Sequence, residues 1–300
     1  MALKRGSEQH EGDDFLEGVD VDVGQEDMAH LGVGKACTEK TNGTNTFALK
    51  EDVETFSWEN GVVRYAFAVN YTTEQRYTIL DAMNNLAELV NSGSDGGKCI
   101  EYTPYDTEKD EGKEFVWFYP GEGCESTVGA PHDNSNRHVS LASGCMERGI
   151  VQHELIHVLG FWHEQSRVDR DQYVDIKWEN IKNGICENFK MYADPIDDHL
   201  GLPYDLRSIM HYKSTAFSKN MEDTIVPKNR MKPDILGQRK KPTEIDLMKV
   251  RLRYNCTAKK DPSEYLKLLA VPVGDEVGAA AQRNATASDF IGSGIDWRRN

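Results

Sequence analysis

One short stretch of the sequence contains the residues best suited to catalysis, three histidines and a glutamate. His153 and His157 stand four positions apart, so in a helix both imidazoles lie on one face and can reach the same metal ion. Glu154 follows the first histidine, where a carboxylate can take a proton from a metal-activated water. His163 adds a third ligand six positions after His157. Three protein ligands with an open fourth position predict a catalytic zinc site.

Gly160 separates the second and third histidines and is expected to end their helix. Glycine turns at little cost through the left-handed conformation that brings the chain back toward the metal. The alternative is a buried helix that carries histidines by chance, which the added glycine and third histidine argue against. The whole pattern, from His153 to His163, matches the signature of the metzincin superfamily of zinc peptidases.

Segments further along the chain narrow this resemblance to one family. Residues 164–171 follow the third histidine and begin with a glutamate, and residues 208–212 are Ser-Ile-Met-His-Tyr. With Gly-Gln-Arg at 237–239, the region from about 58 to 256 resembles the astacin family of secreted zinc endopeptidases. The glutamate directly after the third histidine is typical of that family.

The resemblance implies a role for each residue of the site. One zinc ion would be held by the neutral imidazoles of His153, His157 and His163. Glu154 would act as general base toward the water and then carry the proton to the leaving amine. Tyr212 would bind the zinc at rest and swing away to stabilise the tetrahedral oxyanion.

Residues beside these have other expected roles. Met210 matches the methionine turn, an apolar floor beneath the ligands in astacins. His211 is easily mistaken for a ligand, and we leave it out of the site. Glu164 matches a glutamate that, in astacins, contacts the new N-terminus through water once the propeptide is removed. By resemblance, that terminus lies near Leu49.

The region before His163 has the periodicity of an α+β fold. Alternation over 62–69 predicts a strand, with Val63, Tyr65, Phe67 and Val69 on its buried face. A capping box at 72–75 opens a helix that Gly93 ends. Further strands are expected at 99–102, 115–119 and 138–141. In astacins, this half is a twisted, mostly parallel sheet backed by two helices.

The region after His163 predicts a loop-rich half. Residues 164–256 show little periodicity apart from an amphipathic stretch near 245–252. The zinc site would lie in the cleft between the two halves, a common place for an active site. Substrate would lie extended in this cleft and pair with an edge strand at 124–126.

Six cysteines allow fifteen pairings, and composition selects none of them. The resemblance implies two bridges, Cys99 with Cys256 and Cys124 with Cys145. Cys37 and Cys186 are left over. Either these two pair with each other, or Cys37 is lost with a propeptide and Cys186 is free.

Length and charge exclude some classes of partner. The chain has 300 residues and a formal net charge of −15, which would repel the phosphates of a nucleic acid. No apolar run approaches the length of a membrane-spanning helix, so no membrane partner is expected. The first residues show no secretory signal, and we expect that the sequence starts after a missing signal or is an incomplete precursor.

Three parts are expected: an acidic propeptide-like segment over 1–48, an astacin-like catalytic domain over 49–256 and a tail without a recognisable module over 257–300. Composition alone makes the first segment a disordered tail. In astacins a propeptide aspartate caps the zinc. Asp20 or Asp22 would do so here, although the family's Phe-x-Gly-Asp pattern carries an extra residue in this chain. The thiolate of Cys37 is the rival capping group, as in matrixins.

Together these features predict a secreted, monomeric zinc endopeptidase that acts on protein or peptide substrates. Four Asn-x-Ser/Thr glycosylation sequons would fit a secretory route; they begin at Asn42, Asn70, Asn255 and Asn284. The alternative function is an inactive, protease-like binding or matrix protein. Loss of the general base or of a metal ligand would indicate that alternative, and the sequence retains both the base and all three histidines.

A specificity hypothesis concerns Arg239 in the Gly-Gln-Arg segment. In some relatives, a basic residue near the pocket after the cut favours acidic substrates, because a guanidinium pairs with a carboxylate through two bonds. Alternatively, Arg239 faces solvent or pairs with a local acid such as Glu244, and Lys213 is a rival basic candidate.

Overall fold

The computed structural model describes residues 37, 57–94, 97–131, 137–191, 200–228 and 232–256. The chain divides into two compact units, Met1–Ala258 and Lys259–Asn300, and all described residues belong to the first. Several expectations fall outside the described residues: capping by Asp20 or Asp22, the terminus near Leu49, the sequons at Asn42 and Asn284, and the tail over 257–300.

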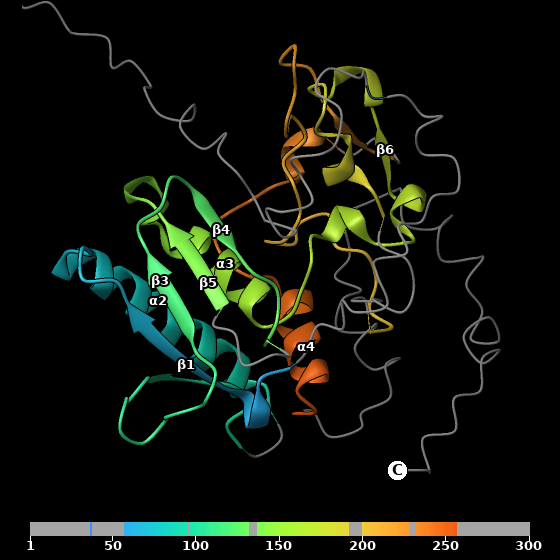
Figure 1. Cartoon of the computed structure of the whole chain (residues 1–300). Coiled ribbons are helices and arrows are strands. Elements are labelled where there is room, and N and C mark those ends of the chain that lie inside the picture. The colour runs from blue at the N-terminus through green and yellow to red at the C-terminus, as the bar shows by residue number, and fades with distance from the viewer. Residues whose placement is uncertain are drawn as a thin grey trace, which may run out of the picture. The chain divides into compact units, whose positions relative to one another are not determined.

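A five-stranded sheet forms the first half of the structure (Figure 1). Its strands are β1 (Val62–Phe67), β2 (Glu101–Pro104), β3 (Val116–Tyr119), β4 (Cys124–Ser126) and β5 (Arg137–Leu141). They lie in the order β2-β1-β3-β5-β4. The edge strand β4 runs antiparallel to β5, and the other neighbours are parallel. The expected α+β fold with a mostly parallel sheet is confirmed.

Two strands have boundaries that differ from those the sequence predicts. β1 stops at residue 67, and Val69 is 91% exposed, so its place on the buried face is wrong. The chain turns there toward the next helix. β2 begins at residue 101 instead of 99, because the amides of Cys99 and Ile100 donate to Oδ1 of Asn91 at 2.7 and 3.1 Å.

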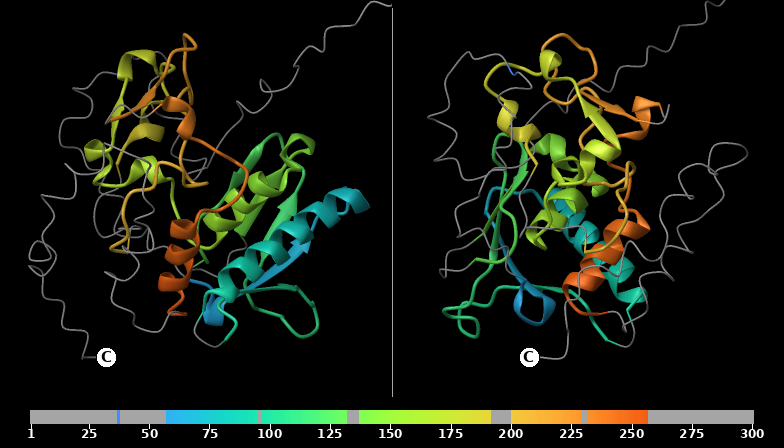
Figure 2. Two further views of the ribbon diagram at one scale, coloured as in Figure 1. Left: turned by 180° about the vertical axis from the view of Figure 1, so that it is seen from behind. Right: turned by 90° about the vertical axis from the view of Figure 1, so that its right-hand side faces the viewer.

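Two helices, α2 (Thr73–Ser92) and α3 (Arg148–Val158), cover one face of the sheet (Figures 1 and 2). The expected capping box opens α2: Thr72 Oγ1 accepts from the amide of Gln75 at 3.2 Å, and Gln75 Oε1 accepts from that of Thr72 at 2.9 Å. Gly93 caps the other end, as expected. The helices and the sheet enclose the first hydrophobic core, which includes Ile79, Met83, Leu86, Phe118 and Leu155.

The second half consists mainly of loops and short 3-10 helices, as expected. Two short strands, β6 (Val174–Ile176) and β7 (Ile225–Pro227), pair antiparallel. A second core surrounds them and includes Trp178, Phe189, Tyr204 and Tyr212. The amphipathic stretch near the end forms α4 (Glu244–Arg253) and returns to the first core through Leu247 and Val250.

Three disulfide bonds connect distant parts of the chain. Two are those that the resemblance implied, Cys99–Cys256 and Cys124–Cys145. Cys37 pairs with Cys186, which decides between the two alternatives left open by the sequence. Cys37 is 4% exposed and belongs to the second core.

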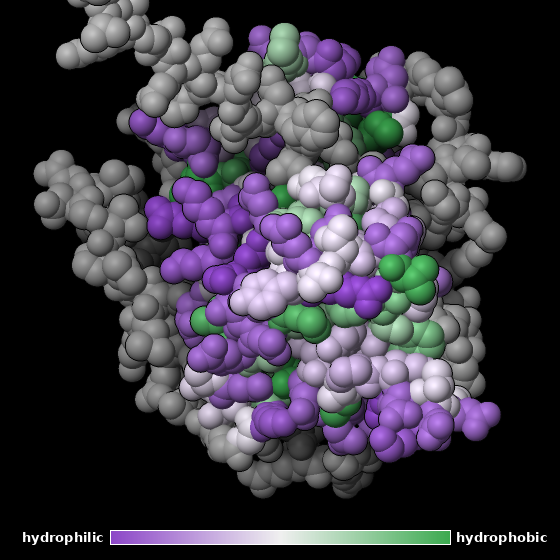
Figure 3. Space-filling view, turned by 90° about the vertical axis from the view of Figure 1, so that its left-hand side faces the viewer, coloured by the Kyte–Doolittle hydropathy of each residue, from purple (hydrophilic) through white to green (hydrophobic). Residues whose placement is uncertain are grey.

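None of the helices described is both long enough and apolar enough for a membrane crossing. On the face shown in Figure 3, hydrophobic residues occur in small groups among hydrophilic ones. Such scattered apolar side chains are ordinary on a protein surface.

Candidate metal centre

The three predicted histidines meet in the structure. His153 and His157 project from α3, which is buried along almost its whole length. Gly160 follows the helix with φ of +100°, the left-handed conformation expected of it. A Cβ at this position would also lie 2.8 Å from the Arg253 guanidinium. His163 comes next, and the ligand atoms of the three buried imidazoles all lie within 4.8 Å of one another.

Backbone carbonyls set the tautomer of two of these imidazoles. His153 Nδ1 lies 2.7 Å from the Ile209 oxygen, and His157 Nδ1 lies 2.6 Å from the Phe161 oxygen. A carbonyl oxygen only accepts, so each Nδ1 carries the proton and each Nε2 keeps a lone pair. Such carbonyl partners orient metal-bound histidines in proteins and raise their basicity.

The remaining geometry fits zinc. The Nε2 atoms of His153 and His157 are 3.2 Å apart. Two nitrogens that hold a tetrahedral zinc at about 2.0–2.1 Å lie about 3.3 Å from each other. Two lone pairs at this distance repel unless a cation lies between them, so the donor set is that of a zinc site.

Glu154 and Tyr212, the predicted catalytic residues, are both buried, the first next to a ligand in sequence and the second against a ligand ring. Glu154 is fully buried on α3, next to the first ligand in sequence. The Tyr212 ring is 3% exposed, and its centroid lies 4.4 Å from that of His163. Its amide donates to Oε1 of Gln165 at 3.0 Å, which ties the tyrosine to the segment after the third ligand.

Both ring nitrogens of His211 have hydrogen-bond partners other than a metal. Its Nδ1 donates to the Tyr212 carbonyl at 2.7 Å, so Nε2 accepts from the Tyr204 hydroxyl at 2.8 Å. Burial lowers the pKa of His211 to about 4, and the imidazole is neutral near pH 7. The two ring nitrogens therefore stabilise the chain over 204–212 through these hydrogen bonds.

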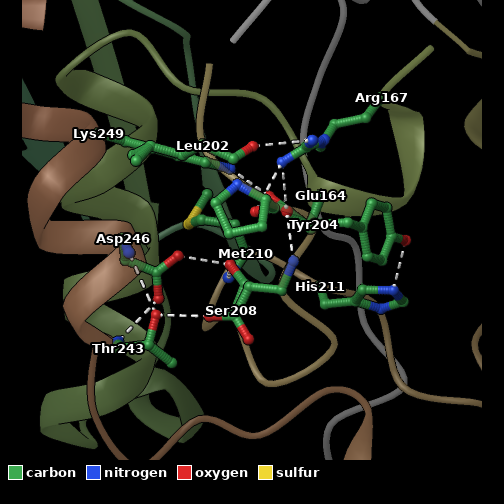
Figure 4. A network of polar contacts seen from close by, with 12 residues as sticks. Glu164, Arg167, Leu202, Tyr204, Ser208, Met210, His211, Thr243, Asp246 and Lys249 are labelled. Atoms are coloured by element: carbon green, nitrogen blue, oxygen red, sulfur yellow. Dashed lines mark hydrogen bonds and ion pairs between the residues drawn. The ribbon is translucent and has the colours of Figure 1, made fainter. Parts of the chain in front are cut away.

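A buried polar network joins the last ligand to α4 (Figure 4). Glu164, beside His163, is 1% exposed; it accepts from Arg167 Nη1 at 3.1 Å and from the Asp205 amide at 2.9 Å, and it pairs with Lys249. Burial acts to raise the pKa of Glu164, but the charges of Lys249 and Arg167 outweigh it, and the pKa is lowered. The expected contact with a new N-terminus involves residues outside those described.

The methionine turn packs against the same network. Met210 is 3% exposed in the first core, and its carbonyl accepts from the Glu164 amide at 3.0 Å. Ser208 Oγ and the Ile209 amide donate to the Asp246 carboxylate at 2.5 and 3.0 Å. The turn is therefore held against both the last ligand and α4.

Sequence reasoning missed Asp246 and Lys249 among the members of this network. The spacing of Thr243 and Asp246 is a capping-box signal, and both bonds of that box form at the start of α4. This signal could have identified Asp246. Nothing in the sequence marks Lys249, whose contact with Glu164 spans 85 positions.

Arg239 has partners that differ from those considered in the specificity hypothesis. Its Nη1 donates to the carbonyls of Ile209 and His211 at 2.8 and 3.0 Å. The local acid Glu244 instead pairs with Arg251. Nη1 of Arg239 is thus engaged by backbone carbonyls, and the acidic preference stays a prediction.

The predicted substrate strand lies at the edge of the sheet and contacts the zinc helix. β4 ends the strand order, so one of its edges is not used within this sheet. The chain after β4 passes α3, where the Gly129 amide donates to the His157 carbonyl at 2.9 Å. An extended peptide added at this edge would thus run close to the second ligand.

Comparison with known families decides the classification. The family model for astacin, which describes a peptidase family, matches residues 50–255. The chain belongs to the astacin family. Among solved structures, high choriolytic enzyme 1, a hatching enzyme zinc-protease from Oryzias latipes, matches with a TM-score of 0.56 and 35% identity. That match covers 67% of this chain and 93% of the hatching enzyme.

Curated relatives of this astacin include several metalloproteinases. Zinc metalloproteinase nas-4 of Caenorhabditis elegans is 36% identical over 222 residues, which cover 74% of this chain and 66% of the relative. Meprin A subunit beta of Mus musculus is 42% identical over 160 residues, 53% of this chain and 22% of the subunit. The low choriolytic enzyme of Oryzias latipes is 36% identical over 233 residues, which cover 76% of this chain and 79% of that enzyme. The chain thus spans just under two thirds of nas-4 and far less of the meprin subunit.

Proposed function

We propose that this astacin-family chain is a secreted zinc endopeptidase that hydrolyses internal bonds of protein or peptide substrates. The observation that carries the proposal is the convergence of three buried imidazoles, two of them held as Nδ1–H tautomers, beside a buried glutamate. Three disulfides favour an oxidising compartment and hence secretion.

Each residue of the centre has a task in this proposal. Zinc, when bound, supplies a Lewis acid that polarises a carbonyl and lowers the pKa of a water molecule. His153 and His157 would hold the metal through their Nε2 lone pairs, with His163 as the third ligand. Glu154 takes the proton from the attacking water and delivers it to the leaving amine. The Tyr212 hydroxyl would donate a hydrogen bond to the developing oxyanion.

The alternative, an inactive protease-like binding protein, requires the loss of a ligand or of the base. All three histidines lie together in the structure, and Glu154 lies buried beside them. The chain therefore retains the residues that hydrolysis needs, and these residues support the proposal of an enzyme.

Metal removal tests the proposal directly. Purified active protein should contain about one zinc per chain and cleave an unstructured protein such as casein. Treatment with a chelator followed by gel filtration should abolish cleavage, and one molar equivalent of zinc should restore it, because the ligands are neutral side chains ready to bind. Metal content is measured by mass spectrometry on the same samples. Full cleavage by protein that has lost its metal would contradict the proposal.

Maturation is the second part of the proposal. We infer that residues 1–48 are a propeptide and that the mature enzyme begins between Thr46 and Glu51. The Cys37–Cys186 bond has a direct consequence for this step. Cys37 precedes Leu49 by twelve positions (49 − 37), so cleavage of the backbone leaves the released segment covalently attached to the catalytic domain.

We therefore expect that the active enzyme runs on a denaturing gel as one band without reductant and as two fragments with reductant. N-terminal sequencing of the larger fragment should start between Thr46 and Glu51. A Cys37→Ser, Cys186→Ser double variant is the control, and its small fragment should separate without reductant. Active enzyme with an uncut backbone over residues 1–50 would contradict the maturation step. Separation of the wild-type fragment without reductant would contradict the attachment.

A further inference from the structure

The backbone of Ile209 connects the metal centre to the loop before α4. Its carbonyl oxygen receives two donors, His153 Nδ1 at 2.7 Å and Arg239 Nη1 at 2.8 Å. Its amide donates to the Asp246 carboxylate at 3.0 Å. Ile209 itself is fully buried. The backbone of Ile209, whose carbonyl orients the first ligand, is therefore held by two charged side chains.

The same arginine also reaches the segment that carries Tyr212. Arg239 Nη1 donates to the His211 carbonyl at 3.0 Å, one residue before the tyrosine. The two hydrogens of Nη1 are thus shared between carbonyls on either side of Met210, and a third contact goes to the Gln238 carbonyl at 3.2 Å. All three contacts come from one nitrogen, and the planar guanidinium fixes the directions of its two hydrogens.

Two glycines permit this loop to lie close to the metal centre. A Cβ on Gly149, in the first turn of α3, would lie 1.7 Å from the Arg239 carbonyl oxygen. A Cβ on Gly237 would lie 2.3 Å from the Cα of Lys213, and this glycine has φ of +75°. The loop over 237–240 is therefore pressed between the zinc helix and the chain that follows Tyr212.

We propose that Arg239 is a positioning residue for the metal centre: through the Ile209 carbonyl it fixes the His153 imidazole, and through the His211 carbonyl it fixes the backbone that carries Tyr212. Loss of a group that orients a metal ligand commonly weakens metal binding by roughly ten- to a hundredfold. The inference rests on the zinc site of the proposed function and not on hydrolysis. Its readouts are metal affinity and metal geometry.

The first test replaces Arg239 in the full-length chain. Arg239→Met is expected to weaken zinc binding roughly ten- to a hundredfold in competition with a chelator. It should also change the visible absorption spectrum of the cobalt-substituted protein, which reports the geometry around the metal. Arg239→Lys should bind zinc with an affinity between that of the wild type and that of Arg239→Met, because the ammonium can replace part of the contact.

Arg251 offers a matched control. It also donates to backbone carbonyls, those of Val90 at 2.9 Å and Leu89 at 2.8 Å, but these lie at the end of α2. Arg251→Met should lower the melting temperature and leave the zinc affinity and cobalt spectrum unchanged. If Arg239→Met behaves in the same way, Arg239 has a purely structural role and the proposal is overturned.

A glycine pair tests the loop without removing any polar group, should Arg239→Met fail to fold. Gly149→Ala places a methyl group against the Arg239 carbonyl and should weaken zinc binding by displacing the loop. Gly144→Ala, just before α3, meets nothing within 4 Å and should bind zinc as the wild type does. A folded Gly149→Ala protein with unchanged zinc affinity would also overturn the proposal.

Discussion

Glu154→Gln is expected to retain zinc and to lose nearly all peptidase turnover, on the order of a hundred- to ten-thousandfold in kcat. Glutamine preserves the shape of the side chain at this fully buried position on α3. The amide has no basic oxygen that can take the proton from the attacking water. The histidines that hold the metal are untouched, so binding and fold should remain.

The measurement is kcat on a fluorogenic peptide, with zinc content and melting temperature determined on the same preparation. Glu147→Gln is a suitable control, because this glutamate is exposed at the start of α3 and its side chain makes no capping bond. The control should keep wild-type kcat. Near-normal turnover by zinc-loaded Glu154→Gln would show that another group is the base.

Tyr212→Phe is expected to lower kcat far more than it raises KM, because the hydroxyl is proposed to act mainly in the transition state. Removal of one donor to an oxyanion costs roughly 3–4 kcal/mol in a comparable role. Phenylalanine should keep the ring in place, where it packs against Phe189 and Phe217 with centroids 5.9 and 5.5 Å away.

Tyr71→Phe provides the matched control for this change. The Tyr71 hydroxyl donates to the Leu141 carbonyl at 3.1 Å in the first core, outside the metal centre. Its removal should cost about 0.5–1.5 kcal/mol of unfolding free energy and leave kcat unchanged. A Tyr212→Phe enzyme with normal kcat and only a higher KM would refute the transition-state role of the hydroxyl.

The ends of the strands show where local patterns stop being informative. The alternation through Val69 continues past the point where β1 loses its place in the sheet, and Val69 is exposed. β2 starts late because Asn91, at the end of α2, takes the amides of Cys99 and Ile100. Periodicity records which residues could face a core, whereas pairing partners decide where a strand begins and ends.

The sequence by itself determined the core of the metal centre, because its determinants are local. The helical spacing of His153 and His157 and the left-handed turn at Gly160 place the ligands within eleven consecutive residues. Capping boxes are local in the same way, and the predicted start of α2 was confirmed. Tyr212, 49 positions after His163 (212 − 163), was identified only through resemblance to a family.

The tertiary structure alone decided the contacts between residues far apart in the chain. The pairing of Cys37 with Cys186 spans 149 positions, and that of Glu164 with Lys249 spans 85. For Arg239 the sequence left a substrate contact, solvent and a local acid open, and the structure shows Nη1 donating to carbonyls about 30 positions earlier. No local pattern encodes such contacts, because they form only when the packing of both cores brings the segments together and leaves buried polar groups that must find partners.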